Sequence, residues 1–274
     1  MPVVGTNTAA NSAILYLNRN SRVQEESLGH LSSGSKIVSA SDDAAGLAVS
    51  SQLEADISVL NQAAINAVQG QAVLNVADGA LKNIGEIAQR MKSLVAQSMS
   101  GSVDVTSRTY LDAEYQELVL EVAAIVDSTR FNGALLIDGN TANSYDQDFL
   151  VGTDAADIIS VDLSGVDLKT PNTALTNVLT PGAAATNLPL VDAVIAEVSS
   201  SRSLVGTLQS RLEFREDVIG TAVENLEAAK STIVDTDIAA EQSRYTTAQV
   251  MTEVATAALA QANNMKTSLL SLVQ

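Results

Sequence analysis

Side chains that could act as catalysts or metal ligands are scarce in this sequence. His30, between Gly29 and Leu31, is the only histidine among 274 residues, and the chain has no cysteine. A serine triad needs a base, a structural zinc site needs several nitrogen or sulfur ligands, and the H-E-x-x-H motif needs a pair of histidines. We therefore predict that the chain is not an enzyme and has no cofactor or metal site. His30 is predicted to have a packing or polar interface role.

The middle of the chain carries aspartates that could bind a hard cation loosely: Asp146, Asp148, Asp154 and Asp157. Their spacing lacks the glycine and the closing glutamate of a calcium-binding loop. A phosphate-binding loop is not visible either, because neither Gly29 nor Gly34 is followed by the required Lys-Ser or Lys-Thr. We interpret the aspartates as solvated loop carboxylates.

Composition and charge narrow the classes of function. The net charge is −17 and the pI is near 4.2, which argues against nucleic-acid binding. Over residues 131–201, Lys169 alone opposes the acidic residues, which predicts either a solvent-facing acidic surface or an ordinary solvated loop region. Hydrophobic residues make up 46% of the chain but aromatic residues only 3%, and such small apolar side chains suit slender, closely packed helices.

Neither a membrane span nor a secretory signal is visible. Residues 57–77 lack charge, but they contain several Asn and Gln side chains that would be costly to place in lipid. The first cation of the chain is Arg19, so no basic region precedes an apolar run at the N-terminus. If the protein leaves the cell, we expect it to use a route that needs no cleavable signal.

Apolar residues recur at helical spacing through both ends of the chain. The periodicity predicts helices over residues 14–31, 42–100, 111–125, 205–233 and 248–272, with Arg215 as the only break in the fourth series. The Ser and Asp residues of 39–43 are suited to cap the second helix, through a hydroxyl that accepts from its free N–H groups and carboxylates near its positive end.

The terminal segments carry apolar seams that are typical of coiled coils. Such seams are stabilised only when they dock, and helices at chain ends otherwise fray. We predict that subunit packing involves the seam positions Leu17, Leu28, Leu31, Ala248, Met251, Ala255, Ala258, Ala262, Met265, Leu269 and Leu272. These residues alone do not decide between a polymer and an intramolecular coiled coil in a monomer.

The middle of the chain has a different pattern. Residues 134–137, 149–151 and 158–163 are predicted strands between turn-forming residues, and Asn132-Gly133 favours a turn with positive φ. Residues 170–189 contain Pro171, Pro181 and Pro189 among many Thr, Asn and Ala, which predicts a loop with one short turn of helix.

Several motifs resemble those of bacterial flagellin. The family reads close to LSSG-x-[RK]-I followed by SA-x-DDAAGLA, and this chain has LSSGSKI at 31–37 and SASDDAAGLA at 39–48. Further matches are QRMKSL at 89–94, TRFNG at 129–133, DTDIAAE at 235–241, LAQAN at 259–263 and LLSL at 269–272. They occur in the family's order, and their combination is far more specific than any one of them.

The resemblance implies a mainly α fold, in which long paired helices form coiled coils and a helical bundle and a small β-hairpin region lies in the middle of the chain. Residues 1–41 with 235–274 would form a terminal coiled-coil core domain. Residues 42–136 with 190–234 would form a helical bundle domain, and 137–189 a short outward-facing β and loop region. The chain would thus be a minimal flagellin without large outer domains.

The resemblance also implies a function. Flagellins are structural subunits that polymerise with copies of themselves into the helical flagellar filament for swimming motility. They pass unfolded through the flagellar type III export apparatus and assemble at the distal tip, outside the cell. Expected partners are an export chaperone, which would bind about residues 235–274, and the hook-associated junction and cap proteins. Neither nucleic acid nor membrane is an expected partner.

Arg90, Leu94 and Glu114 match family positions that contact the vertebrate toll-like receptor for flagellin. The resemblance is partial here, because Ser93 stands where the family usually has Glu and Lys92 where it has Arg. These residues are therefore predicted either as innate-receptor contacts or as subunit contacts in the filament.

Three other functions remain open at this point. A hook–filament junction protein shares the paired ends but forms a short ring. A free coiled-coil binding module would have ordered termini in the monomer. A secreted metal-dependent enzyme is disfavoured by the single histidine, His30.

Overall fold

The computed structural model describes residues 6–139 and 145–271, except for the side chains of 266, 267 and 269–271. Of the described residues, 76% are helical, which confirms the prediction of a mainly α chain with a small β-hairpin region. The chain divides into two compact units, one made of Met1–Ala55 with Asn225–Gln274 and one of Asp56–Glu224. Our division into three parts, with its own boundaries, stays a prediction.

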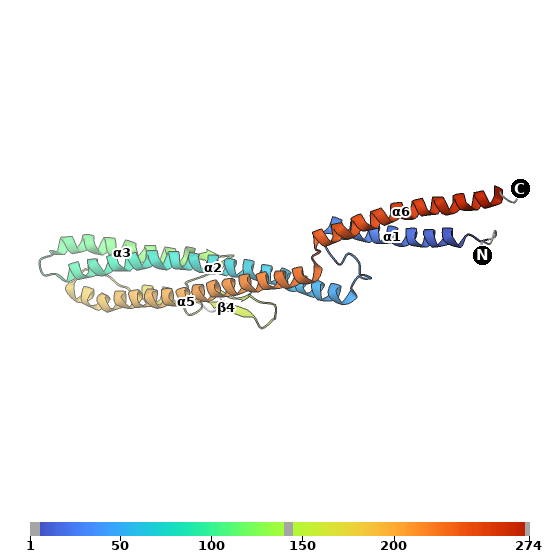
Figure 1. Cartoon of the computed structure of the whole chain (residues 1–274). Helices are drawn as coiled ribbons and strands as arrows, with labels where there is room; N and C mark the ends of the chain where they lie inside the picture. Colours follow the sequence, from blue (N-terminus) through green and yellow to red (C-terminus); the bar gives the residue numbers. More distant parts are fainter. Residues whose placement is uncertain (1–5, 140–144, 272–274) are drawn as a thin grey trace. The chain divides into compact units, whose positions relative to one another are not determined.

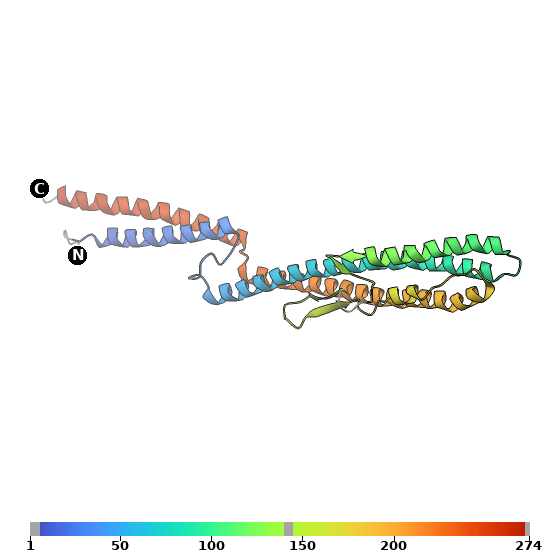
Figure 2. The same ribbon diagram turned by 180° about the vertical axis from the view of Figure 1, so that it is seen from behind.

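The first unit is built on two antiparallel helices, α1 (Thr8–Ser33) and α6 (Ile238–Ser271), which lie side by side (Figures 1 and 2). Asn7 caps the start of α1, because its Oδ1 accepts from the Ala10 N–H at 3.0 Å. Gly34 ends the helix with a φ of 69°, and its N–H donates to the His30 carbonyl at 2.9 Å. This left-handed conformation suits glycine, which has no Cβ to clash.

Backbone hydrogen bonds close the base of this helix pair. The Lys36 N–H donates to the Val234 carbonyl at 2.6 Å, and the Thr236 N–H donates to the Gly34 carbonyl at 3.2 Å. They join segments that are about two hundred residues apart in sequence, on either side of a bridge between Ser35 and Asp235. Residues 34–36 and 234–236 therefore pair with each other in a fixed register.

The start of α2 (Ala44–Met99) is capped by the side chain of Asp43. Asp43 Oδ1 accepts from the N–H groups of Ala45 and Gly46 at 3.1 and 2.9 Å, so a carboxylate takes the place of the predicted hydroxyl. Hydrogen bonds from Ser39 hold the pKa of Asp42 below its usual value. Helix α2 then continues past Asp78 and Gly79 without a break, although the apolar pattern shifts phase there.

The second unit contains α3 (Val105–Ser128) and most of α2 and α5 (Pro181–Val234), which lie side by side in both views (Figures 1 and 2). Its interior is filled by large side chains that are almost fully buried: Leu74, Leu81, Ile84, Met91, Leu94, Tyr115 and Leu212. Arg202 on α5 donates to Asp78 on α2 at 2.8 Å, and Lys92 lies 2.6 Å from Asp192. The unit is thus a helical bundle with a hydrophobic core.

Among its described residues, the second unit also contains two antiparallel hairpins. The strands β1 (Arg130–Phe131) and β2 (Ala134–Leu135) flank Asn132 and Gly133, whose φ values of 50° and 87° confirm the predicted turn. The strands β3 (Asp146–Leu150) and β4 (Ile158–Asp162) pair so that Leu150 lies opposite Ile158.

The loop prediction for residues 170–189 is wrong beyond residue 180. After the short helix α4 (Lys169–Thr173), α5 begins at Pro181, a position that needs no N–H donor. Thr180 Oγ1 accepts from the Ala183 N–H at 3.1 Å and caps this start. Asn187 is fully buried, where it accepts from the Thr176 N–H at 2.8 Å and donates to Thr176 Oγ1 at 2.9 Å. The composition of this segment favours a loop, but Thr180 and Asn187 find hydrogen-bond partners at and near the start of a helix instead.

Within residues 6–139 and 145–271, we find no helix that combines the length and the apolar character needed to cross a membrane.

Candidate assembly surfaces

The interior of the α1–α6 pair is thin. On α6, the buried residues recur every seven positions, at Glu241, Ala248, Ala255 and Ala262. On α1, they are Ala10, Ala13, Ser27 and His30. A spacing of seven is the repeat of a coiled-coil seam, but alanine removes little apolar surface from water. The pair therefore gains little hydrophobic stabilisation from its own contact.

Polar contacts fix the register of this pair. Asn7 Nδ2 on α1 donates to the Ala262 carbonyl on α6 at 3.1 Å. Near the middle of the pair, Gln24 Nε2 donates to the Tyr245 hydroxyl at 3.4 Å. These hydrogen bonds specify which residues face each other, and each adds about 1 kcal/mol at most to stability.

The sole histidine lies in this seam. His30 Nδ1 is 3.4 Å from Glu241 Oε1, and both side chains are buried. A hydrogen bond from Ser27 lowers the pKa of Glu241, with further contributions from His30 and from Arg244, whose Nη1 lies 3.5 Å from Oε2. Glu241 was not predicted as a functional residue. The available signal was its position seven residues before Ala248, in phase with the apolar seam.

Large apolar side chains flank the pair without being buried in it. On α1 and α6, the exposed ones are Ile14, Leu15, Tyr16, Val23, Leu28, Ile238, Val250, Met251, Val254 and Met265. Scattered exposed apolar residues are common, but this many on a thin helix pair favour an interaction surface.

The predicted packing residues fall into two groups. Ala248, Ala255 and Ala262 are buried between the helices, and Leu17 and Leu31 are half-buried. Leu28, Met251, Ala258 and Met265 are exposed. The Leu269 side chain and Leu272 lie outside the described residues. Contact of any of these residues with another subunit stays a prediction.

An open groove of about 560 Å³ lies between α1 and α6. Its lining is mixed: Tyr16, Arg19, Asn20, Val23, Glu26 and Ser27 on α1, and Glu241, Ser243, Arg244, Thr247, Ala248 and Met251 on α6. A mixture of apolar and charged side chains in a groove between helices suits another helix better than a small molecule.

In the second unit, Arg215 explains the break in the apolar series of α5. Its Nε donates to the Val151 carbonyl at 2.9 Å, and its Nη2 donates to Asp157 Oδ1 at 2.7 Å. From α2, Asn66 Nδ2 donates to the Leu150 carbonyl at 3.0 Å. The β3–β4 hairpin is therefore held on the bundle by hydrogen bonds from α2 and α5.

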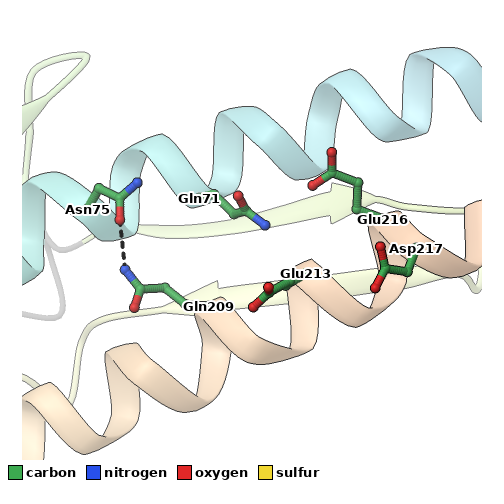
Figure 3. Close-up of a pocket in the computed structure, with 6 residues that line it drawn as sticks. All are labelled: Gln71, Asn75, Gln209, Glu213, Glu216 and Asp217. Carbon is green, nitrogen blue, oxygen red and sulfur yellow. Dashed lines mark hydrogen bonds between the residues drawn. The ribbon is translucent and has the colours of Figure 1, made fainter. Parts of the chain in front are cut away.

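A polar groove crosses α2 and α5 beside this hairpin (Figure 3). It is lined by Gln71, Asn75, Gln209, Glu213, Glu216 and Asp217, and Gln209 Nε2 donates to Asn75 Oδ1 at 3.0 Å. Among the described residues, no group of three or more His, Cys, Asp or Glu side chains is arranged to hold a metal ion. The groove is thus an acidic surface open to solvent.

The three residues predicted as receptor contacts differ in exposure. Arg90 and Glu114 are exposed, and Arg90 Nε donates to Glu114 Oε1 at 2.7 Å between α2 and α3. Leu94 is 1% exposed and packs in the bundle core. The structure thus places two of the three side chains at the surface.

Comparison with known proteins identifies the family. Residues 4–142 match the bacterial flagellin N-terminal helical region, and residues 188–273 match the bacterial flagellin C-terminal helical region. These two matches cover most of the chain. The chain belongs to the bacterial flagellin family. Flagellins are structural proteins that build flagellar filaments, so this chain is a structural filament subunit.

Individual relatives agree with this assignment. A flagellin of Halalkalibacterium halodurans is 34% identical over 99% of this chain and 100% of its own length. The flagellar filament 33 kDa core protein of Treponema phagedenis is 31% identical over 99% of this chain and 100% of its own length. The crystal structure of Bacillus cereus flagellin is 27% identical, with a TM-score of 0.53, over 61% of this chain and 94% of that one. The similar lengths support a compact flagellin without large outer domains.

Proposed function

We propose that this flagellin is exported unfolded through the flagellar type III apparatus and folds its terminal helices against neighbouring copies at the distal tip of the filament. The observation that carries the proposal is the mismatch within the terminal unit. The α1–α6 pair buries mainly alanine, while residues such as Leu28, Met251 and Val254 are exposed beside that seam. Burial of an exposed Leu or Met side chain contributes about 1.5–3 kcal/mol, so neighbours would supply what the isolated pair lacks.

The proposal includes the other flagellar partners. An export chaperone would cover about residues 235–274 before export, because an exposed apolar α6 face would otherwise promote premature association. Hook-associated junction and cap proteins would bound the filament at its two ends. The protein would then be extracellular.

Recognition by the host toll-like receptor is a separate proposal. Arg90 and Glu114 would form the contact, and Leu94 would support it from beneath, because its side chain is buried. Arg90→Ala should lower receptor signalling by free subunits more than Arg211→Ala, a change at an exposed arginine on α5. Equal signalling by both variants would contradict a role for Arg90.

Seeded polymerisation tests the assembly proposal. The purified chain is added to short filament seeds, and polymer is measured by sedimentation and electron microscopy. Ala258 is exposed in the free subunit, so Ala258→Glu should leave folding intact and abolish elongation. Ala258→Ser, which adds no charge, should elongate nearly as well as the wild type. Filaments of normal length from Ala258→Glu would contradict the proposal, whereas short stubs from the wild type would indicate a junction protein.

A further inference from the structure

We propose that Met251 and Met265 are sites of oxidative modification that control whether a free subunit can join the filament. This inference rests on the proposed function, because it requires that the α6 face carrying these methionines be covered by a neighbouring copy. It adds a chemical class of reagent, hydroperoxides, and a reversible product, methionine sulfoxide.

Exposure separates the methionines of the described residues. Met251 and Met265 are 51% and 56% exposed, Met99 at the end of α2 is 39% exposed, and Met91 in the bundle core is 1% exposed. Thioether oxidation follows access of the oxidant to sulfur. The terminal helix therefore presents its methionines to a peroxide, whereas the bundle core protects Met91.

The two exposed methionines lie on one stripe of α6, beside its buried seam. Met251 and Met265 each come three residues after a buried alanine, Ala248 and Ala262, and Ala258 stands in the same relation to Ala255. Residues three apart are neighbours on a helix surface. The two methionines thus belong to a second, exposed heptad stripe beside the buried one, with small Ala258 between them.

The sequence has no competing sulfur nucleophile. Because the chain contains no cysteine, a peroxide that reaches it meets thioethers and no thiols. In the reaction, the thioether sulfur loses two electrons and forms a bond to one peroxide oxygen. The O–O bond breaks, and after a proton transfer the other oxygen leaves as water from hydrogen peroxide or as an alcohol from an organic hydroperoxide. Sulfoxide reductases with a thiol reductant reverse the product, one enzyme for each epimer.

The sulfoxide changes the stripe from apolar to strongly polar. In the free subunit both side chains are solvated, so the helix pair tolerates the change. Between subunits, an unpaired sulfoxide oxygen would be buried at a cost, as for any polar group without a partner. We expect the critical concentration for seeded elongation to rise by about tenfold or more.

The test uses the full-length chain and hydrogen peroxide. Free wild-type subunits are treated, the extent of oxidation at each methionine is read by peptide mass spectrometry, and seeded elongation is measured. We expect sulfoxide at Met251 and Met265, none at Met91, the tenfold rise in critical concentration, and recovery after treatment with both sulfoxide reductases. Met251→Leu/Met265→Leu, a nearly volume-conserving change, should elongate equally well before and after peroxide. The matched control Met99→Leu should remain as sensitive as the wild type.

Three results would overturn the inference. The oxidised wild type could elongate normally, the double leucine variant could lose elongation to the same extent as the wild type, or Met251 and Met265 could oxidise equally fast in filaments and in free subunits. In the first two cases untreated subunits still elongate, so the proposed function stands. The third result would mean that neighbouring copies do not cover this face of α6, and it would therefore also count against the proposed function. If untreated wild-type subunits do not elongate on seeds, the proposed function and this inference both fail.

Discussion

The two units of this flagellin bury different kinds of side chain. The second unit fills its interior with Leu74, Leu81, Ile84 and Tyr115, each nearly inaccessible to solvent. The first unit buries mainly alanines and the polar pair His30–Glu241, and it leaves many of its larger apolar residues exposed. We propose that the bundle of the second unit is stable by itself, whereas the α1–α6 pair of the first unit needs neighbouring copies. The contrast supports our proposal that the first unit completes its folding only on assembly.

The largest expected effect on stability comes from creating a cavity in the second unit. Leu81→Ala should destabilise the bundle by about 2–5 kcal/mol, because Leu81 is fully buried and its loss leaves a void. Urea unfolding of the free subunit, followed by circular dichroism, measures this change. Leu120→Ala, at an exposed position on α3, should stay within about 0.5 kcal/mol of the wild type. Equal losses for the two variants would remove the contrast between core and surface.

A smaller effect should follow when the β3–β4 hairpin loses its hold on the bundle. Arg215→Leu removes the hydrogen bonds to the Val151 carbonyl and to Asp157, which should cost about 1–3 kcal/mol. Limited proteolysis should cut residues 145–165 faster in this variant. Arg211→Leu, one helical turn earlier on the exposed face, serves as the matched control and should be cut at the wild-type rate.

The smallest effect concerns the polar seam of the first unit. The pKa of Glu241 is lowered from 4.5 on folding, chiefly by Ser27, so its carboxylate stabilises the pair above pH 4.5 and this contribution is lost as the pH falls below that value. Glu241→Gln should therefore weaken the α1–α6 pair at pH 7, and its difference from the wild type should narrow in acid. Helicity of the terminal segments measured against pH for both proteins checks this. If the stability difference between the two proteins grew as the pH fell, Glu241 could not stabilise the pair as a carboxylate.

Much of the fold was predictable from the sequence because it depends on periodicity. The apolar spacing predicted α2, the middle of α3 and the part of α5 from residue 205 onward, and Asn132-Gly133 predicted its turn. The loop prediction over residues 181–189 failed because composition does not reveal that Asn187 finds partners in Thr176 and Asn177. Those contacts join residues that local sequence rules treat separately.

The assembly surfaces were predictable only in part. The heptad pattern marked the residues of both stripes on α6, but it could not tell Ala255, which faces α1, from Ala258, which is exposed. That distinction depends on the rotation of α6 against α1, which Asn7 and the His30–Glu241 contact fix. Similarly, Arg215 was visible as a break in a pattern, but its partners Val151 and Asp157 lie on a hairpin about sixty residues away in sequence.

Hydrogen exchange of backbone amides, compared between free subunits and filaments, tests the central contrast most directly. We predict that α1 and α6 exchange rapidly in the free subunit while the core of the second unit is protected, and that α1 and α6 become protected in the filament. Strong protection of α1 and α6 already in the free subunit, unchanged on polymerisation, would contradict it and would favour a self-sufficient coiled-coil module.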